Sequence, residues 1–409
     1  MERTDIERKI SQVRQDFALL RDGSLRYLDN AATTQKPDSV LRAVQAYYEE
    51  ENANPFRGVY ELSEKATLHY EAARAAAAGF IGANADEIIF TRNATEGMNL
   101  LAYSLGSTLS EGDEVVVSVV EHHSNFLPWR AACLRSGAKL VKLECDECGN
   151  ISEEAFRAVV SERTKIVAMT QLSNVLGKEY DVRNLARIAH EIGAIMVADG
   201  AQSVPHMKVD VKELGIDFMA FSGHKMLAPM GIGVLYGRKE LLEKMPPFME
   251  GGEMIETVHW DRVRYAEVPH KFEAGTVNVG GAVGLEAAIR YMENIGWELI
   301  EEQESYLTEL AVGLIKELDG ITITGSADAA DHKGIVSFTV DGVHPHDVAE
   351  ILGRQGICVR AGHHCAQPLM DQLGVRSTTR ASFAFYNTEE EVRAFAEALG
   401  KVRGLMGYA

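Results

Sequence analysis

The sequence lacks long apolar segments. None of its apolar runs approaches the ~18 residues that a helix needs to cross a bilayer. Residues 1–17, MERTDIERKISQVRQDF, are rich in charge and lack the apolar core of a signal peptide. We therefore expect a cytoplasmic protein without a membrane segment, which begins with an amphipathic helix.

Cysteine and positive charge are also scarce. The cysteines number five, an odd count that in a cytosolic chain indicates free thiols, at most one of them reactive. The 41 basic residues are outnumbered by 60 acidic ones, for a net charge of −19. This balance argues against nucleic-acid binding, because phosphate backbones require basic patches. A small anionic ligand is still possible, since local arginines and helix ends can bind it.

Short apolar runs alternate with helical patterns through the first two-thirds of the chain. Helical patterns such as NFLPWRAACLRSG and VRNLARIAHEIG lie between most of these runs. This alternation predicts an α/β fold with a mainly parallel sheet. Six of the runs are predicted to be buried strands: EIIFT (87–91), EVVVSVV (114–120), KIVAMTQ (165–171), AIMVADG (194–200), FMAFS (218–222) and GVLYG (233–237).

The pattern changes near Val283. A long helical stretch over 283–318 leads into IVSFTV, a helix near HDVAEILGRQ, two more apolar runs and a last helix. These elements predict a smaller α+β domain. No internal repeat or low-complexity linker separates the two parts, so we expect them to pack closely.

Polar residues follow several predicted strands, where open α/β sheets bind ligands. Ala94 and Thr95 would begin a helix after the first strand, and its N–H groups and the Thr95 hydroxyl could hold a phosphate. A simple helix cap is the alternative there. His122 and His123 follow the second strand, where a histidine could stack on a flat ring, donate a proton or bind metal. A satisfied core histidine is the more common outcome.

Later strands end in further polar residues. Asp199 follows four apolar residues and is costly to bury unless a cation meets it, such as a protonated ring nitrogen. Gln202 could bind the same ligand. Ser222 and His224 could donate to a phosphate beside Lys225, a residue type rarely buried unless paired or chemically employed. Together with the helix start and the imidazole, this set is what pyridoxal phosphate (PLP) requires, with the lysine forming an imine.

Seven motifs in family order resemble the SUF-type cysteine desulfurases of the class V aminotransferase group. The similarity runs from about Tyr27 to Asn387. The resemblance implies a fold-type-I PLP enzyme that converts L-cysteine to L-alanine and keeps the sulfur as a persulfide for iron–sulfur cluster assembly. The motifs are YLDNAATTQKP, TRNATEGMNL, EHHSN, DGAQSVPH, SGHKMLAPMGIGVLYG, EAGTVNVG and RAGHHCAQPLM.

The resemblance also implies a division of the chain into three parts. A helical arm over 1–20 would pack with the small domain. A large PLP-binding α/β domain with a mainly parallel seven-stranded sheet would occupy 21–290. A small α+β domain over 291–409 would carry the catalytic cysteine loop.

The resemblance assigns roles to individual residues. Lys225 would form the Schiff base, His122 would stack on the ring and help in proton transfer, and Asp199 would pair with the pyridine nitrogen. Cofactor contacts are further implied for the following residues: Thr95, Ser222 and His224 at the phosphate, Thr276 at the phosphate from the other subunit, and Gln202 and Asn174 at the ring hydroxyl or substrate. Substrate contacts are implied for Ala31, Asn174, Arg360 and Arg380, with Arg380 clamping the carboxylate through its planar fork.

Cys365 would accept the sulfur. Its loop contains Gly362 for mobility, and Arg360, His363 and His364 would favour the thiolate. A buried structural cysteine is the plain alternative. A His-His-Cys metal site is disfavoured because adjacent histidines point apart in an extended loop, so we expect no metal.

The implied partners are L-cysteine, a second copy of the chain in a homodimer, and a sulfur-acceptor protein of the SUF system, SufU- or SufE-like. Neither nucleic acid nor a membrane is expected. A selenocysteine lyase is the nearest alternative, because it shares every coenzyme motif. A kynureninase-like carbon–carbon lyase would not need the GHHCA loop. A non-catalytic scaffold is opposed by the intact Lys225 and Asp199.

Two features depart from the family pattern. Phe56 stands in NANPFRGVY where the family often has a histidine, which puts any polar role of that position in doubt. Cys145 and Cys148 form a CxxC pair that the family does not require. One such pair is a weak zinc signal, because a structural zinc normally needs four ligands. We interpret it as a surface turn.

Overall fold

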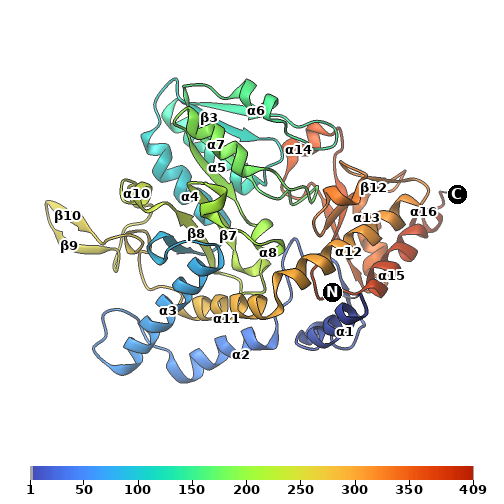
Figure 1. The fold of residues 1–409 in the computed structure, drawn as a ribbon, viewed down its shortest axis with the longest axis horizontal. Helices are drawn as coiled ribbons and strands as arrows, with labels where there is room; N and C mark the ends of the chain where they lie inside the picture. The colour runs from blue at the N-terminus through green and yellow to red at the C-terminus, as the bar shows by residue number, and fades with distance from the viewer. Residues whose placement is uncertain (1–2, 409) are drawn as a thin grey trace.

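The computed structural model describes residues 3–408 and places a large seven-stranded sheet at the centre of the fold (Figure 1). The strand order is β2-β8-β7-β6-β5-β3-β4. Strand β8 is antiparallel to both neighbours, and all other neighbouring pairs are parallel. This confirms the predicted mainly parallel seven-stranded sheet. The strands are β2 (Ile88–Thr91), β3 (Glu114–Ser118), β4 (Lys139–Leu143), β5 (Thr164–Thr170), β6 (Ile195–Asp199), β7 (Phe218–Ser222) and β8 (Gly233–Gly237).

The sheet is buried on both faces, as its apolar strands predict. Val116 of β3 packs in one core, while Val115 and Val117 pack in another, because successive side chains point to opposite faces. Strand β4 was not predicted, since its sequence KLVKL places lysines at its exposed positions. The helices that cover the two faces include α3 (Glu61–Phe80), α4 (Ala94–Ser104), α5 (His123–Ser136), α7 (Val182–Glu191) and α11 (Val279–Ile295).

The C-terminal part contains a four-stranded antiparallel sheet in the order β11-β12-β15-β14 with its own core. The predicted helical stretch over 283–318 is two helices, because the chain turns at Gly296 with a φ of +84°. The elements here are α12 (Trp297–Lys316), β11 (Ile321–Ile323), β12 (Ile335–Val340), α13 (Pro345–Gly353), β13 (Ile357–Cys358), β14 (Arg360–Gly362), α14 (Gln367–Gln372), β15 (Thr378–Ser382) and α15 (Glu389–Gly400).

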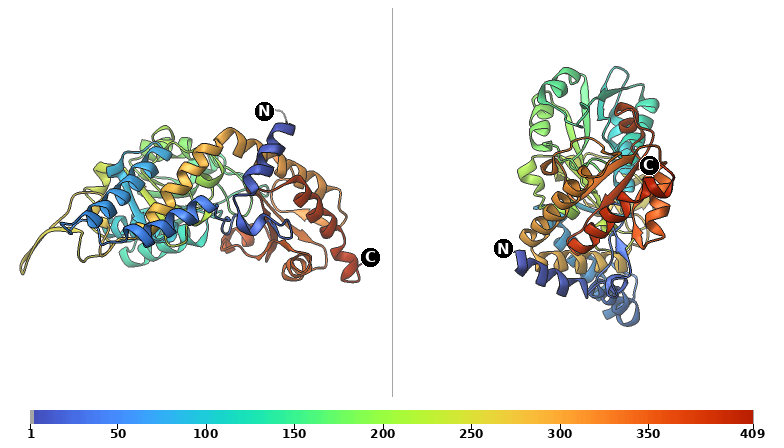
Figure 2. Two further views of the ribbon diagram at one scale, coloured as in Figure 1. Left: turned by 90° about the horizontal axis from the view of Figure 1, so that it is seen from below. Right: turned by 90° about the vertical axis from the view of Figure 1, so that its right-hand side faces the viewer.

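The N-terminal segment lies against the C-terminal part (Figure 2). The predicted first helix is α1 (Arg3–Arg14), and the buried Arg14 pairs with Glu391 at 2.6 Å. Strand β1 (Arg26–Tyr27) then pairs in parallel with β13. This path brings the chain beside the carboxyl ends of the central strands, where the YLDNAATT motif begins.

A two-stranded hairpin projects from the large sheet (Figure 1). It comprises β9 (Ile255–His259) and β10 (Arg262–Tyr265), and the side chain of Trp260 at its turn is fully exposed. No helix within residues 3–408 is both long and apolar enough to cross a membrane. The remaining helices are α2 (Asp38–Ala46), α6 (Glu153–Val159), α8 (Ser203–His206), α9 (Val211–Leu214), α10 (Lys239–Leu242) and α16 (Val402–Leu405).

The two departures from the family pattern have definite environments. Phe56 has a φ of +72° and packs edge-to-face against Tyr70 and His270, at centroid distances of 5.9 and 5.6 Å. Its environment is therefore aromatic. The interpretation of the CxxC pair as a surface turn holds only for the exposed Cys148, because Cys145 is buried in the core.

Candidate active site

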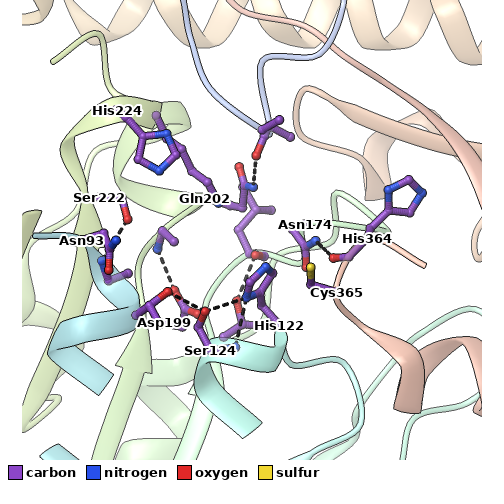
Figure 3. Close-up of a pocket in the computed structure, with 18 of the residues that line it drawn as sticks. Asn93, His122, Ser124, Asn174, Asp199, Gln202, Ser222, His224, His364 and Cys365 are labelled. Atoms are coloured by element: carbon purple, nitrogen blue, oxygen red, sulfur yellow. Dashed lines mark hydrogen bonds between the residues drawn. The ribbon is translucent and has the colours of Figure 1, made fainter. Parts of the chain in front are cut away.

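A pocket of about 280 Å³ lies beyond the carboxyl ends of the central strands (Figure 3). The C-terminal part closes it with the loop after β14, and the N-terminal segment closes it with Ala31 and Ala32. The predicted site residues that line it are Ala31, Thr95, His122, Asn174, Asp199, Gln202, Ser222, His224, Lys225, Arg360, Cys365 and Arg380. Thr276 instead lines two separate hollows on the same chain.

One end of the pocket is an anion-binding arrangement at the start of α4. Asn93 caps this helix by accepting the Glu96 N–H, as the sequence predicted for a helix beginning at Ala94. The Ala94 N–H donates to the Ser222 hydroxyl oxygen at 2.9 Å, which leaves the hydroxyl hydrogen free to donate. Burial lowers the pKa of His224 to about 4, so its ring is neutral. Its buried Nδ1 atom has no partner among residues 3–408.

Asp199 and Gln202 provide acceptors at the floor of the pocket. Asp199 ends β6, where burial raises the pKa of its carboxyl group and Oδ1 accepts the Ala201 N–H at 2.9 Å. Gln202 donates from Nε2 to the Ala31 carbonyl at 2.8 Å. Its Oε1 atom is buried and has no partner within the described chain. Such an orphaned acceptor is costly unless a ligand supplies a donor.

His122 is the N-cap of α5 and is a neutral imidazole. Burial, followed by the charge of Lys225, lowers its pKa to about 3. Nδ1 accepts the Ser124 N–H at 3.1 Å, so the ring proton lies on Nε2. The Ser124 hydroxyl is 2.7 Å from that of Thr95 and joins the two helix starts. Ser124 lies in the EHHSN motif, but the sequence predicted no role for it.

Lys225 ends the short turn that follows β7. Burial lowers the pKa of its amine to about 8, although the nearby Asp199 carboxylate acts in the opposite direction. A substantial fraction of the amine is therefore neutral just above physiological pH. A partly neutral amine can act chemically as a nucleophile or as a base.

Two arginines from the C-terminal sheet also line the pocket. Arg360 of β14 lies opposite Arg380 of β15 in the strand register. Arg360 pairs with Asp29 through Nε and one terminal nitrogen, at 3.1 and 2.9 Å. Arg380 donates to the Asn174 carbonyl at 2.8 Å and lies 3.5 Å from Asp29. Burial lowers the pKa of Arg380 to about 10, and its buried Nε has no partner in the described structure. A carboxylate could fill that vacancy.

Asp29 received no predicted role, although it pairs with both arginines. It lies in the YLDNAATT motif, about 330 positions before Arg360. Sequence spacing gave no sign of this contact. The local signal was an acidic residue two positions after the short strand β1.

The Cys365 loop is exposed but held in place. His123 N–H donates to the Cys365 carbonyl at 2.6 Å, and Asn174 Nδ2 donates to the His364 carbonyl at 2.8 Å. The Cys365 N–H donates to His363 Nδ1 at 3.1 Å. His364 and Cys365 both have left-handed backbones, with φ values of +50° and +56°. These contacts direct the loop toward the pocket (Figure 3).

His364 does not supply the expected positive charge. Its ring is buried, which lowers its pKa to about 3, and Nε2 lies 2.8 Å from the Thr378 hydroxyl. His364 is therefore a neutral ring, and any support that it gives to the thiolate would not come from a positive charge. The cations that interact with the Cys365 thiol are Arg360, which Asp29 partly compensates, Arg380 and Lys225.

The donor set fits PLP. A helix start with free hydroxyl donors suits a phosphate, a buried carboxylate suits a pyridinium nitrogen, and an amine suits an aldehyde. The orphaned atoms of Gln202 and His224 agree with a polar ligand between them. Within the described chain, no group of three or more His, Cys, Asp and Glu side chains is arranged to hold a metal ion.

Comparisons with known proteins agree on one family. The aminotransferase class V family matches residues 26–395. A probable cysteine desulfurase of Halalkalibacterium halodurans is 50% identical over 386 residues, 94% of each chain. The apo structure of a cysteine desulfurase from Thermococcus onnurineus NA1 is 44% identical, with a TM-score of 0.93 over 96% of this chain and 98% of that one.

A second solved structure is similarly close. It is the cysteine desulfurase CsdA (S-sulfonic acid) from Escherichia coli, 38% identical, with a TM-score of 0.90 over 97% of this chain and 98% of that one. The matches cover nearly the whole length of both partners in each comparison. The chain therefore belongs to the class V aminotransferase family, in the group that contains these cysteine desulfurases.

Proposed function

We propose that this protein is a PLP-dependent cysteine desulfurase, which converts L-cysteine to L-alanine and leaves the sulfur as a persulfide on Cys365. The observation that carries the proposal is the convergence of Lys225, Asp199, His122 and Cys365 on one pocket. A lysine and a carboxylate suit the coenzyme, and a thiol at the pocket rim suits a sulfur acceptor. The relatives' names as cysteine desulfurases support it.

PLP would be held from three sides. When bound, it supplies an electron sink for charge leaving the substrate α-carbon. Asp199 would meet the ring nitrogen, His122 would stack on the ring, and Gln202 would offer its orphaned Oε1 to the ring hydroxyl. Thr95, Ser222 and His224 would hold the phosphate at the start of α4.

Lys225 is the proposed base for the substrate α-proton. Its amine can accept a proton because its lowered pKa of about 8 leaves much of it neutral in mild alkali. His122, as a neutral ring with its proton on Nε2, would donate rather than accept at that atom. In this proposal Lys225 accepts a proton from the substrate and His122 donates one.

The low pKa of Lys225 predicts a pH dependence for the coenzyme-free protein. Covalent attachment of PLP requires the neutral amine, whose fraction rises by roughly tenfold per pH unit below about pH 8 and levels off above it. The attachment rate, followed by stopped-flow absorbance of lysine-bound PLP from pH 6.5 to 9, should follow this curve. A rate independent of pH would contradict it.

The substrate carboxylate would bind at the orphaned Nε of Arg380. Ala31, Asn174 and Arg360 would line the rest of the substrate site.

The Arg380→Lys variant keeps the charge but loses the planar fork. Losing a hydrogen bond to a charged group costs roughly 1.5–3 kcal/mol, so KM for L-cysteine should rise about ten- to a hundredfold. Steady-state kinetics check this, and an unchanged KM would place the carboxylate elsewhere, with Arg360 the next candidate.

Sulfur transfer would occur at Cys365. Its thiolate attacks the substrate sulfur, a sulfur–sulfur bond forms, and the carbon–sulfur bond breaks with its electron pair remaining on the carbon. That carbon is then protonated and becomes the methyl group of alanine. The persulfide would pass to an acceptor protein, SufU- or SufE-like, for iron–sulfur cluster assembly in the cytoplasm.

A homodimer would complete the phosphate site. Thr276 lies outside the pocket of its own chain, which supports its delivery to the pocket of a second copy. The exposed apolar side chains of Leu62, Leu68 and Tyr48, on and near α2 and α3, supply surface for such a contact.

The proposed division of the chain remains an arm over 1–20, a large domain over 21–290 and a small domain over 291–409. The Arg14–Glu391 pair supports docking of the arm on the small domain.

The direct test is to measure alanine and sulfide release from L-cysteine by the PLP-loaded protein with dithiothreitol as the reductant that frees sulfide from the persulfide. A parallel sample without reductant is used for mass analysis of the peptide that contains Cys365. Equimolar products and a 32 Da increase on that peptide are expected, because one sulfur atom is added. Release of alanine without modification of Cys365 would contradict the assigned sulfur acceptor.

A further inference from the structure

The carbonyl oxygen of His224, directly before Lys225, is surrounded by donors from one short segment. The Thr34 N–H lies at 3.1 Å, the Thr33 hydroxyl at 3.0 Å and the Thr34 hydroxyl at 3.2 Å. The Lys36 Nζ atom is closest of all, at 2.9 Å. A carbonyl oxygen has two lone pairs, so these donors exceed its ordinary capacity. The ammonium is the strongest of them, because charge-assisted hydrogen bonds are shorter and stronger.

The same segment also holds the chain just after Lys225. The Leu227 N–H donates to the Thr34 hydroxyl at 2.9 Å. Leu227 has a φ of +69°, a conformation that a leucine rarely adopts without outside support. One threonine hydroxyl therefore bridges the residue before Lys225 and the second residue after it. The turn that carries the reactive amine is fixed on both sides by residues about 190 positions away.

Lys36 is the one charged side chain among these donors to the His224 carbonyl. Its ammonium donates to the Thr34 carbonyl at 2.5 Å as well as to that of His224. Within residues 3–408 no carboxylate pairs with Lys36, and burial lowers its pKa to about 7, so the ammonium predominates only below neutral pH. Burying a lysine ammonium without an acidic partner costs folding free energy. Its two carbonyl contacts tie the segment to the turn.

We propose that Lys36 is a positioning residue for Lys225: by clamping the His224 carbonyl, together with Thr33 and Thr34, it holds the Lys225 amine where it can attack a bound aldehyde. This inference rests on the proposed function of Lys225. Lys36 touches neither substrate nor coenzyme in the proposal, because it does not line the pocket. It acts only through the backbone of the turn.

The experiment compares Lys36→Met with a matched control, Lys271→Met. Lys271 is also a buried lysine that donates to a backbone carbonyl, that of Glu243 at 2.9 Å, and it does not line the pocket. Both variants keep the aliphatic stem and lose the ammonium. The probe is PLP added to the coenzyme-free proteins, with three readouts: rapid non-covalent binding by fluorescence quenching, the rate of covalent attachment by absorbance, and the melting temperature.

At pH 6.5, where Lys36 is mostly protonated, we expect Lys36→Met to attach PLP covalently about tenfold more slowly than the parent, because a charged hydrogen bond to the turn is lost. Non-covalent binding should stay close to that of the parent, since the phosphate donors are intact. The melting temperature should fall no further than in Lys271→Met, whose attachment rate stays at the parent value. Lys36→Arg should recover most of the rate, because it restores a cationic donor.

Each other outcome has a definite meaning. If Lys36→Met attaches PLP at the parent rate, the inference is wrong and the proposed function is untouched. If attachment slows equally in Lys271→Met, the effect is general destabilisation and the inference is again wrong. If the parent protein forms no covalent PLP adduct, the proposed function itself fails.

Discussion

The Lys225→Ala variant is expected to lose turnover of L-cysteine by at least about three orders of magnitude while remaining folded. Lys225 is both the proposed covalent anchor of PLP and the base for the substrate α-proton, and a positioned base alone contributes roughly 10²–10⁴-fold. Among residues 3–408 no other lysine lines the pocket, so none could replace it. Alanine release, measured on protein supplied with excess PLP, checks the loss.

The absorbance spectrum provides the control for this variant. PLP should still bind through the donors at the start of α4, because they are untouched, but the band of lysine-bound coenzyme should disappear. Lys271→Ala serves as a matched replacement of a buried lysine outside the pocket and should keep both band and turnover. A persisting band in Lys225→Ala would show that another amine holds the coenzyme.

The Cys365→Ala variant should lose cysteine desulfuration almost completely but keep its coenzyme. The substitution removes the proposed sulfur acceptor and leaves Lys225, His122 and Asp199 in place. The variant should therefore stay yellow and change its spectrum when cysteine is added. It should not release alanine catalytically, because no thiolate remains to take the sulfur.

Selenocysteine separates this chemistry from a structural role of Cys365. A selenol is more acidic than a thiol and the carbon–selenium bond is weaker, so selenium can leave without a nucleophile. We expect the variant to keep much of any selenocysteine activity that the parent shows. Equal loss on both substrates would indicate a structural or acid–base role. Full retention on cysteine would point to another thiol, with Cys358 the nearest in sequence.

Much of the fold and of the pocket could be predicted because most of the polar residues that line the pocket directly follow predicted strands. Asp199, His122 and Lys225 each follow an apolar run, and parallel strands bring their carboxyl ends to one edge. Strand β4 was missed because its lysines obscure the apolar pattern. The break at Gly296 was missed because helical periodicity continues on both sides of it.

The electrostatics could not be predicted, because they depend on contacts between distant segments. Asp29 meets Arg360 only after β1 pairs with β13, and no sequence pattern encodes that pairing. The neutral state of His364 could not be predicted for the same reason, since its burial depends on the packing of the loop against β15. The sequence was enough to predict which residue types form the pocket, but not the protonation states of their side chains.

The left-handed backbone of the Cys365 loop has a consequence for the direction of sulfur delivery. For residues other than glycine, this conformation costs roughly 1–2 kcal/mol each, and His364 and Cys365 both adopt it. The hydrogen bonds from His123 and Asn174 offset that cost while the loop faces the pocket. Without them, extended conformations would be lower in energy for both residues. If Cys365 carries sulfur as proposed, turning the loop away from the pocket would release this backbone strain, and returning it would require the hydrogen bonds from His123 and Asn174 to form again.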